Sequence, residues 1–279
     1  MQGRLLPPQD GRFQCFPRTG WRDEFPIAAA AGLDAIEWIY DQQGADANPI
    51  ASDRGVEEVL VLSRQHGVSV VSVCADYFMD RPFVEAVGPS FDRLMSDLLW
   101  LWSRARLMGM ERIVLPFVDS SRIRTAEQFD RITAMLIRVA DACRHEPPEI
   151  HLETDLDPSG FNRLLKLLPT SFIKANYDSG NSAALAYDTR QELSAYGDRI
   201  GSVHIKDRMR AGGTVPLGTG NADLPTLLTG LARLSYRGDF VLQVARGEPG
   251  AELEWTRSNV AYLRHELERA SLAGRGTPN

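Results

Sequence analysis

Cysteine is scarce in this chain. Only three cysteines occur in 279 residues, Cys15, Cys74 and Cys143, and no two of them have the Cys-x-x-Cys spacing of a redox or zinc motif. This pattern argues against a disulfide framework and against a structural zinc site built from thiolates. We therefore expect three reduced thiols in or near the core.

Long apolar runs and an excess of positive charge are also missing. No run approaches the roughly 20 residues that a membrane span needs, and the opening MQGRLLPPQD lacks the apolar core of a signal peptide. The formal net charge is −6, which gives no electrostatic reason to expect nucleic acid as a partner. The sequence predicts a cytoplasmic protein that binds neither membranes nor nucleic acids.

A glycine-rich phosphate turn after an early strand is absent as well, which counts against a doubly wound open sheet. Present instead is a regular alternation of strand-like and helix-like segments. The strand candidates are Met1–Leu6, Ala35–Tyr40, Val68–Ala75, Arg112–Val118, Glu149–Glu153, Phe172–Tyr177, Gly201–Ile205 and Phe240–Ala245. The helix candidates are Trp21–Ala31, Gly55–His66, Ser90–Leu107, Thr125–Arg144, Pro158–Leu168, Arg190–Tyr196, Leu224–Leu234 and Leu253–Ala270.

This alternation predicts the fold. Continuous runs of Val, Ile and Leu suit parallel strands that are covered on both faces. Eight strand-then-helix units in a chain of this length predict an α/β protein with a (β/α)8 TIM barrel. We expect a single barrel domain over residues 1–272 and a disordered tail over 273–279. Thr125 and Gln128 have the spacing of a capping box at a helix start.

Four strand candidates end in polar side chains of metal-binding types. These residues are Glu153, Asp178, His204 and Gln243. In a barrel the carboxyl ends of the strands meet at one face, where active sites lie. Two carboxylates, an imidazole and an amide oxygen suit a divalent ion such as Mn²⁺, Mg²⁺, Co²⁺ or Zn²⁺. The alternative is that each residue pairs with a neighbouring lysine or arginine.

Basic and hydrogen-bonding residues also gather near the predicted strand ends. The basic residues are Arg4, Lys206, Arg208 and Arg246. Such a group at a barrel mouth suits a carboxylate or a phosphate, although surface arginines on loops are an equally good explanation of each one alone. Further candidates to hydrogen-bond hydroxyl groups are Gln2, Asp41, Asp76 and Asn176.

Several segments resemble the sugar phosphate isomerase/epimerase superfamily, whose members are xylose-isomerase-like TIM barrels. The matching segments are QGRL (2–5), GLDAIEWIYD (32–41), HLETD (151–155), NYDSGN (176–181), VHIKDR (203–208) and PLGTGNADLPTLLTGLARLSYRGDFVLQ (216–243). They cover most of the chain in the expected order. The resemblance implies the same barrel fold, a small sugar or sugar phosphate as substrate and a divalent metal cofactor, and it leaves a homo-oligomer open.

The resemblance also implies roles for particular residues. Ketose epimerases of this superfamily hold their metal with Glu, Asp, His and Glu, of which Glu153, Asp178 and His204 carry over. The position of Glu37 often lines the site in the superfamily, and Asp207, which follows the HIK run, is expected to help hold metal or substrate. Gln243 stands where the last glutamate is expected. Its amide can offer an oxygen to a metal but cannot act as an acid or base at neutral pH.

Three interpretations of function follow. The first is a metal-dependent isomerase or epimerase that works through an enediolate, with Glu153 as the base and Lys206 or a water molecule returning the proton. The second is a lyase that dehydrates a sugar or cyclitol on the same scaffold, which needs only one base. The third is a non-catalytic sugar-binding barrel, which the glutamine at position 243 favours.

Overall fold

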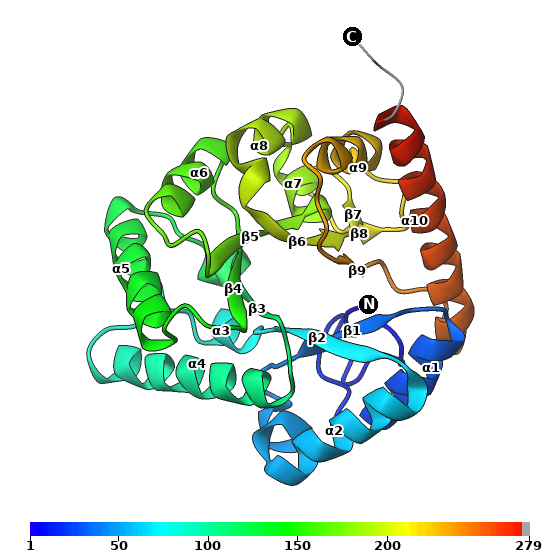
Figure 1. Ribbon diagram of the computed structural model, residues 1–279, viewed down its shortest axis with the longest axis horizontal. Helices are drawn as coiled ribbons and strands as arrows, with labels where there is room; N and C mark the ends of the chain where they lie inside the picture. The colour runs from blue at the N-terminus through cyan, green and yellow to red at the C-terminus, as the bar shows by residue number, and fades with distance from the viewer. Residues whose placement is uncertain (275–279) are drawn as a thin grey trace.

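The structure is a computed structural model that describes residues 1–274. Its core is one sheet of seven strands that curls into a nearly closed barrel (Figure 1). The strands are β1 (Ala35–Ile39), β2 (Ser69–Cys74), β3 (Arg112–Phe117), β4 (Glu149–Thr154), β5 (Ile173–Asp178), β6 (Ile200–Ile205) and β9 (Phe240–Leu242). Each pairs in parallel with the next strand in this order. The predicted TIM barrel fold is confirmed.

The first predicted strand, Met1–Leu6, is reduced to a single bridge that closes the barrel. The Gln2 amide donates to the Leu242 carbonyl at 3.0 Å, and the Glu37 amide donates to the Met1 carbonyl at 3.0 Å. Gln2 therefore lies between β9 and β1, as its bridge to Glu37 also shows. Gly3 then has a φ of +54°, a left-handed conformation that ends an extended strand and that glycine adopts without steric cost.

Helices form an outer ring around the strands (Figure 1). Those close to the predicted segments are α1 (Glu24–Ala30), α2 (Asp53–His66), α4 (Pro89–Leu107), α5 (Ala126–Ala142), α6 (Pro158–Lys166), α8 (Thr189–Tyr196), α9 (Leu224–Arg233) and α10 (Glu252–Gly274). The sequence did not predict α3 (Tyr77–Asp80), α7 (Ser179–Leu185) or the antiparallel pair β7 (Asp207–Arg208) and β8 (Thr214–Val215). These short elements all lie in loops that follow the carboxyl ends of strands.

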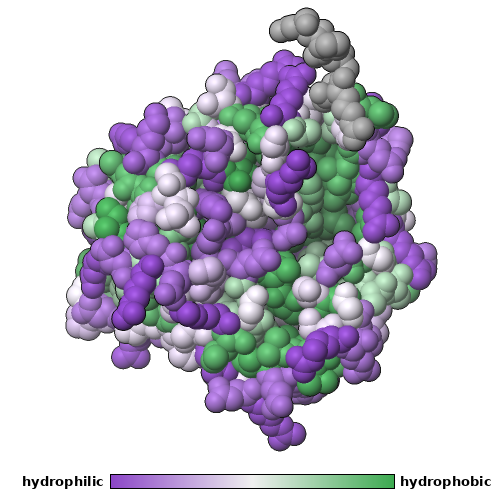
Figure 2. Space-filling model, in the orientation of Figure 1, coloured by the Kyte–Doolittle hydropathy of each residue, from purple (hydrophilic) through white to green (hydrophobic). Residues whose placement is uncertain are grey.

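Burial on both faces explains why the strand sequences are continuous runs of apolar residues. Every residue of β3 is buried, because the helices cover one face and the barrel interior covers the other. Figure 2 shows one face of the molecule as a mixture of hydrophilic and hydrophobic side chains, with hydrophilic groups across the centre of the ring. No helix among residues 1–274 is long and apolar enough to cross a membrane. The predicted tail begins at 273, but α10 reaches Gly274, and residues 275–279 lie outside the described part of the chain.

The capping box at the start of α5 is present as predicted. The Gln128 amide donates to Thr125 Oγ1 at 3.1 Å, and the Thr125 amide donates to Gln128 Oε1 at 3.2 Å. We expect Thr125→Ala to lower the free energy of unfolding by about 1 kcal/mol, because it removes the acceptor for a helix-end amide. Urea denaturation checks the value, and an unchanged midpoint would contradict it.

A buried carboxyl in α1 makes stability depend on pH. Glu24 is 3% exposed, and its Oε1 has no hydrogen-bond partner among the described residues. Burial raises the pKa of Glu24 from 4.5 to about 7, against the opposing effect of the Met1 amino group and Arg246. Between these two values the folded state holds more protons than the unfolded chain, so this carboxyl makes the protein less stable as pH rises through that window.

Glu24→Gln removes the charge that forms inside the fold at high pH. We expect the free energy of unfolding of the variant to rise relative to that of the wild type between pH 5 and pH 8, by up to about 3 kcal/mol. Urea titrations of both proteins at several pH values measure the difference. A gap that is the same at pH 5 and pH 8 would show that this carboxyl does not titrate in that window.

Candidate active site

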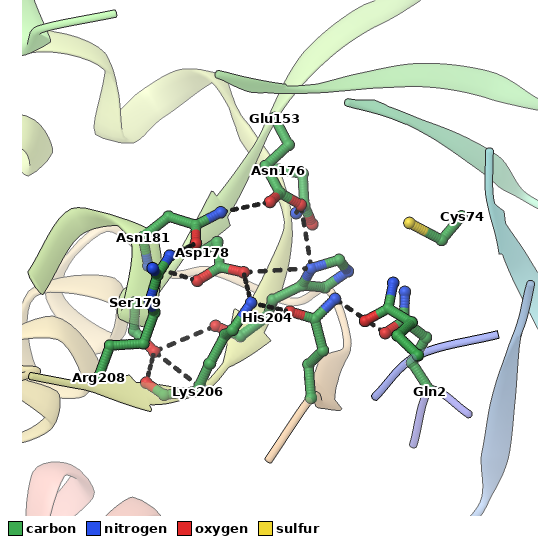
Figure 3. A network of polar contacts seen from close by, with 12 residues as sticks. Gln2, Cys74, Glu153, Asn176, Asp178, Ser179, Asn181, His204, Lys206 and Arg208 are labelled. Carbon is green, nitrogen blue, oxygen red and sulfur yellow. Dashed lines mark hydrogen bonds and ion pairs between the residues drawn. The ribbon is translucent and has the colours of Figure 1, made fainter. Parts of the chain in front are cut away.

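Three of the four predicted metal ligands lie together at the carboxyl ends of β4, β5 and β6. Asp178 and His204 are directly paired in the sheet register. His204 Nδ1 lies 3.2 Å from Glu153 Oε2 and 3.7 Å from Asp178 Oδ2 (Figure 3). One ligand atom from each residue falls within 4.8 Å of the others, and all three residues are buried. These distances fit a shared cation.

Two atoms of this group lack hydrogen-bond partners among the described residues. His204 Nδ1 and Asp178 Oδ2 are both buried and both unsatisfied. An unsatisfied buried polar atom is costly, so an imidazole nitrogen and a carboxylate oxygen that face one another without a hydrogen bond favour an ion between them. A carboxylate, carboxylate and imidazole set is typical of Mg²⁺, Mn²⁺ and Zn²⁺. The residues present therefore fit a divalent metal.

Glu37 holds the other side of the His204 ring. His204 Nε2 lies 2.8 Å from Glu37 Oε1, and the Ser72 hydroxyl donates to Glu37 Oε2 at 2.8 Å. Nε2–H as the donor to Glu37 leaves the Nδ1 lone pair for a metal, as in carboxylate–histidine–metal arrangements. Burial opposes a charged ring, but Glu37 and the other carboxylates raise the pKa of His204 well above its ordinary value. Without a metal the ring therefore carries a proton on Nδ1 toward Glu153 Oε2, and a bound metal would displace that proton. The sequence predicted that Glu37 binds substrate; the structure places it behind His204, 1% exposed.

Two asparagine amides orient the Glu153 carboxylate. Asn176 Nδ2 donates to Oε2 at 3.1 Å, and Asn181 Nδ2 donates to Oε1 at 2.6 Å. Asn181 lies in α7, whose first turn is capped by Asp178: the Asn181 amide donates to Asp178 Oδ1 at 2.7 Å. The helix that the sequence did not predict therefore ties Glu153 to Asp178. Asn176 was predicted to contact substrate, but its contacts are to Glu153 and to the Ser202 hydroxyl.

Gln243, the fourth predicted ligand, has both ends of its amide engaged. Lys206 Nζ donates to Gln243 Oε1 at 2.7 Å, and Gln243 Nε2 donates to Gln2 Oε1 at 2.8 Å. Lys206 Nζ also lies 3.6 Å from Asp178 Oδ2. Gln243 thus stands beside the three-residue cluster, with a lysine ammonium on its oxygen.

A cavity of about 320 Å³ opens above the cluster. Among the residues that the sequence singled out for the site, six line it: Asp41, Asp76, Glu153, Lys206, Arg208 and Gln243. The sequence did not single out several other lining residues, including Arg12, Phe13 and Gln14 from the loop after the first bridge. Nothing in their local pattern marks them, since the loop reaches the cavity only because Gln2 anchors the chain between β9 and β1.

Three further predicted substrate-binding residues are absent from the lining of this cavity. Asp207 accepts hydrogen bonds from the amides of Gly218, Gly220 and Ala222 and so fixes the loop before α9. Arg246 donates to the carbonyls of Gly3, Leu6 and Phe13. Arg4 is 2% exposed and donates to the Gln2 and Gln14 side chains and to the Val244 carbonyl. All three hold backbone or side chains that surround the site.

A larger cavity, of about 620 Å³, lies at the opposite end of the barrel. Its charged groups pair with one another: Lys174 Nζ donates to Glu149 Oε1 at 2.9 Å, and His151 Nε2 lies 3.0 Å from Glu149 Oε2. Size alone would favour this end. The two unsatisfied atoms, His204 Nδ1 and Asp178 Oδ2, lie instead at the carboxyl ends of the strands. We therefore place the candidate site there.

The comparison with known proteins agrees with this geometry. A family model described as a xylose isomerase-like TIM barrel matches residues 25–266. The chain belongs to the xylose isomerase-like TIM barrel family. The match spans β1 to β9 and includes the whole Glu153, Asp178 and His204 cluster.

Individual members of this family are similar to the chain at low identity. A protein of Escherichia coli (strain K12) with the provisional name L-ribulose-5-phosphate 3-epimerase SgbU is 24% identical over 246 residues, which is 80% of this chain and 83% of that protein. The solved structure of an L-ribulose 3-epimerase covers 100% of this chain and 98% of its own, with 17% identity and a TM-score of 0.77. A xylose isomerase-like TIM barrel protein from Mycobacterium smegmatis in complex with magnesium covers 97% and 96%, with 16% identity and a TM-score of 0.72.

The cluster predicts a measurable metal site. We expect the wild-type chain to take up about one Mn²⁺ per chain, and His204→Asn to lose at least about tenfold in affinity because it removes the candidate ligand atom Nδ1. Isothermal titration with Mn²⁺ and metal analysis after dialysis measure both. His265→Asn, on the exposed side of α10, is the matched control. Failure of the wild type to bind Mn²⁺ at millimolar concentration would contradict the assignment.

Proposed function

We propose that this barrel is a metal-dependent isomerase or epimerase of a small sugar or sugar phosphate. The observation that carries the proposal is the buried Glu153, Asp178 and His204 cluster, with two unsatisfied ligand atoms, at the base of a polar cavity. The curated relative and one of the similar structures are named as sugar epimerases, which supports a substrate of this class. A cavity of about 320 Å³ is at the small end of the usual range for ligand sites.

Glu153 is the residue that we assign as the base. Its carboxylate lies at the wall of the cavity and is held in a fixed orientation by the amides of Asn176 and Asn181. Fixed orientation places the carboxylate against one C–H bond of a bound sugar, which lowers the entropic part of the barrier to proton removal.

A divalent metal held by Glu153, Asp178 and His204 would supply Lewis-acid stabilisation of negative charge on the sugar oxygens. Lys206 contributes charge of the same sign from the neighbouring wall, since its Nζ lies between Gln243 Oε1 and Asp178 Oδ2. The sequence predicted that Lys206 or a water molecule returns the proton. We retain Lys206 in the site as an ammonium that binds and polarises the substrate.

Gln243 favours a second candidate reaction, the dehydration of a sugar or cyclitol. An epimerase that uses two carboxylates needs an acid–base group at this position, and an amide cannot fill that role. A lyase needs one base and a proton donor for the leaving hydroxyl. Proton NMR of the products separates the two reactions, because isomerisation conserves mass and dehydration releases water.

The test uses the two ketoses that the similar proteins are named for, L-ribulose and L-ribulose 5-phosphate. We expect Mn²⁺-dependent conversion by the wild type, loss of activity with EDTA, and a fall in kcat of about 10²–10⁴-fold in Glu153→Gln because the base is removed. Glu248→Gln is the matched control, since Glu248 is exposed and absent from the cavity lining. Full turnover by Glu153→Gln would defeat the assignment, and a wild type that binds no metal would favour a non-catalytic sugar-binding barrel.

A further inference from the structure

The site has one well-placed carboxylate and needs a second proton-transferring group. Gln243 cannot be that group, because a carboxamide neither gains nor loses a proton near neutral pH. Its oxygen accepts from Lys206 and its nitrogen donates to Gln2. A glutamate here could accept from Lys206 but could not donate to Gln2 Oε1, which also accepts from Arg4 Nη1 at 3.0 Å. The surroundings of position 243 therefore select an amide.

The hydrogen-bond network that selects this amide continues to a carboxyl group. Arg4 Nη1 donates to Gln14 Oε1 at 2.9 Å as well as to Gln2, and Gln14 Nε2 donates to Asp76 Oδ2 at 2.6 Å. Gln243 and Asp76 are thus the two ends of one connected set of side chains. Gln2, Arg4 and Gln14 connect Gln243 to Asp76. Gln243 and Asp76 both line the same cavity.

Asp76 lines the cavity from the loop that follows the carboxyl end of β2. It follows Cys74, whose thiol lies 3.1 Å from Asp76 Oδ1, and Figure 3 shows Cys74 across the site from Lys206 and Arg208. Each Asp76 oxygen accepts one hydrogen bond from a side chain and keeps a lone pair. Its side chain remains partly accessible within this wall.

We propose that Asp76 is the second proton-transferring residue of this site. This inference rests on the proposed function. Glu153 as carboxylate takes a proton from the sugar carbon and becomes a carboxylic acid, while the C–H electron pair forms the enediolate. Asp76 as carboxylic acid then donates its proton to the enediolate carbon and becomes a carboxylate. Release of a proton from Glu153 to solvent and uptake of one by Asp76 restore both groups, so protons balance over the cycle.

The electrostatic surroundings of Asp76 agree with an acid that exchanges protons near neutral pH. Burial raises the pKa of Asp76 to about 6, hydrogen bonds from Gln14 and Cys74 oppose the rise, and the charges of Glu153 and Asp41 add to it. Among the nearby cations, Arg4 interacts with Asp76: burial lowers the pKa of the Arg4 guanidinium to about 10, and the Asp76 charge opposes that fall. Arg12, Lys206 and Arg208 line the same cavity. A general acid works best when its pKa lies near the working pH.

The other carboxylates of the cavity are less suited to this role. Asp41 accepts from the backbone amides of Phe16 at 2.8 Å and Gly44 at 2.5 Å, which commits it to holding the loop. Asp80 and Asp119 are exposed at the rim. Asp76 alone among them combines depth, a place in the lining and contact with the network that holds Gln243.

Hydrogen exchange separates proton removal from proton return. The experiment follows L-ribulose and L-ribulose 5-phosphate in D2O with the Mn²⁺-loaded protein, by proton NMR, and scores both loss of the substrate C–H signal and formation of product. We expect Asp76→Asn to lose product formation by about 100-fold or more while Glu153 still exchanges the substrate hydrogen. Glu153→Gln should show neither exchange of the substrate hydrogen nor formation of product. Asp97→Asn, a partly buried aspartate that accepts from the Tyr77 hydroxyl outside the cavity, should keep both.

The outcomes are distinct. Asp76→Asn with wild-type product formation, or with exchange and product lost together, overturns the role of Asp76. If Asp76→Asn forms product while Lys206→Met keeps hydrogen exchange but forms none, proton return belongs to Lys206 instead. Asp76→Ser tests the same point if the asparagine variant does not fold, and Mn²⁺ binding shows that the site is intact. A wild type that converts neither ketose sinks the proposed function itself.

Discussion

The need to balance buried charge at one end of the barrel determines the arrangement of this site. Glu37, Glu153 and Asp178 surround His204, which is 0% exposed. Buried carboxylates destabilise a fold unless an opposite charge and hydrogen bonds compensate them. Without a metal, the imidazole supplies that charge, as the raised pKa of His204 indicates. A divalent cation would take its place and displace a proton, which couples metal binding to the protonation of the site.

Gln243 links the strand ends to the N-terminal segment through hydrogen bonds. Its amide joins Lys206 to Gln2, so the short N-terminal segment does more than close the gap between β9 and β1. The same segment supplies Arg4 and the loop with Gln14, which lead to Asp76. In the mechanism proposed above, the Asp76 carboxyl takes the acid–base role that the Gln243 amide cannot fill, and the two side chains belong to one connected network.

The barrel fold persists in this family at low sequence identity. The barrel superimposes on an L-ribulose 3-epimerase with a TM-score of 0.77 at 17% identity, because a barrel needs only apolar strands and covering helices in the right order. In a barrel of this kind the active site is built from side chains at the carboxyl ends of the strands. In the function proposed above, the amide at position 243 leaves this strand end without an acid–base group.

The sequence by itself predicted the barrel, its seven paired strands and the shared strand-end position of Glu153, Asp178 and His204, because strand periodicity, helix caps and strand ends are local patterns. It placed the α5 capping box correctly for the same reason. Tertiary structure alone decided which charged residues reach the cavity. Asp207 holds amides 11 to 15 positions later, Arg246 holds the N-terminal loop, and Glu37 supports His204 from 167 residues away. Such contacts depend on how the chain closes the barrel, and no local spacing encodes the partner of a long side chain.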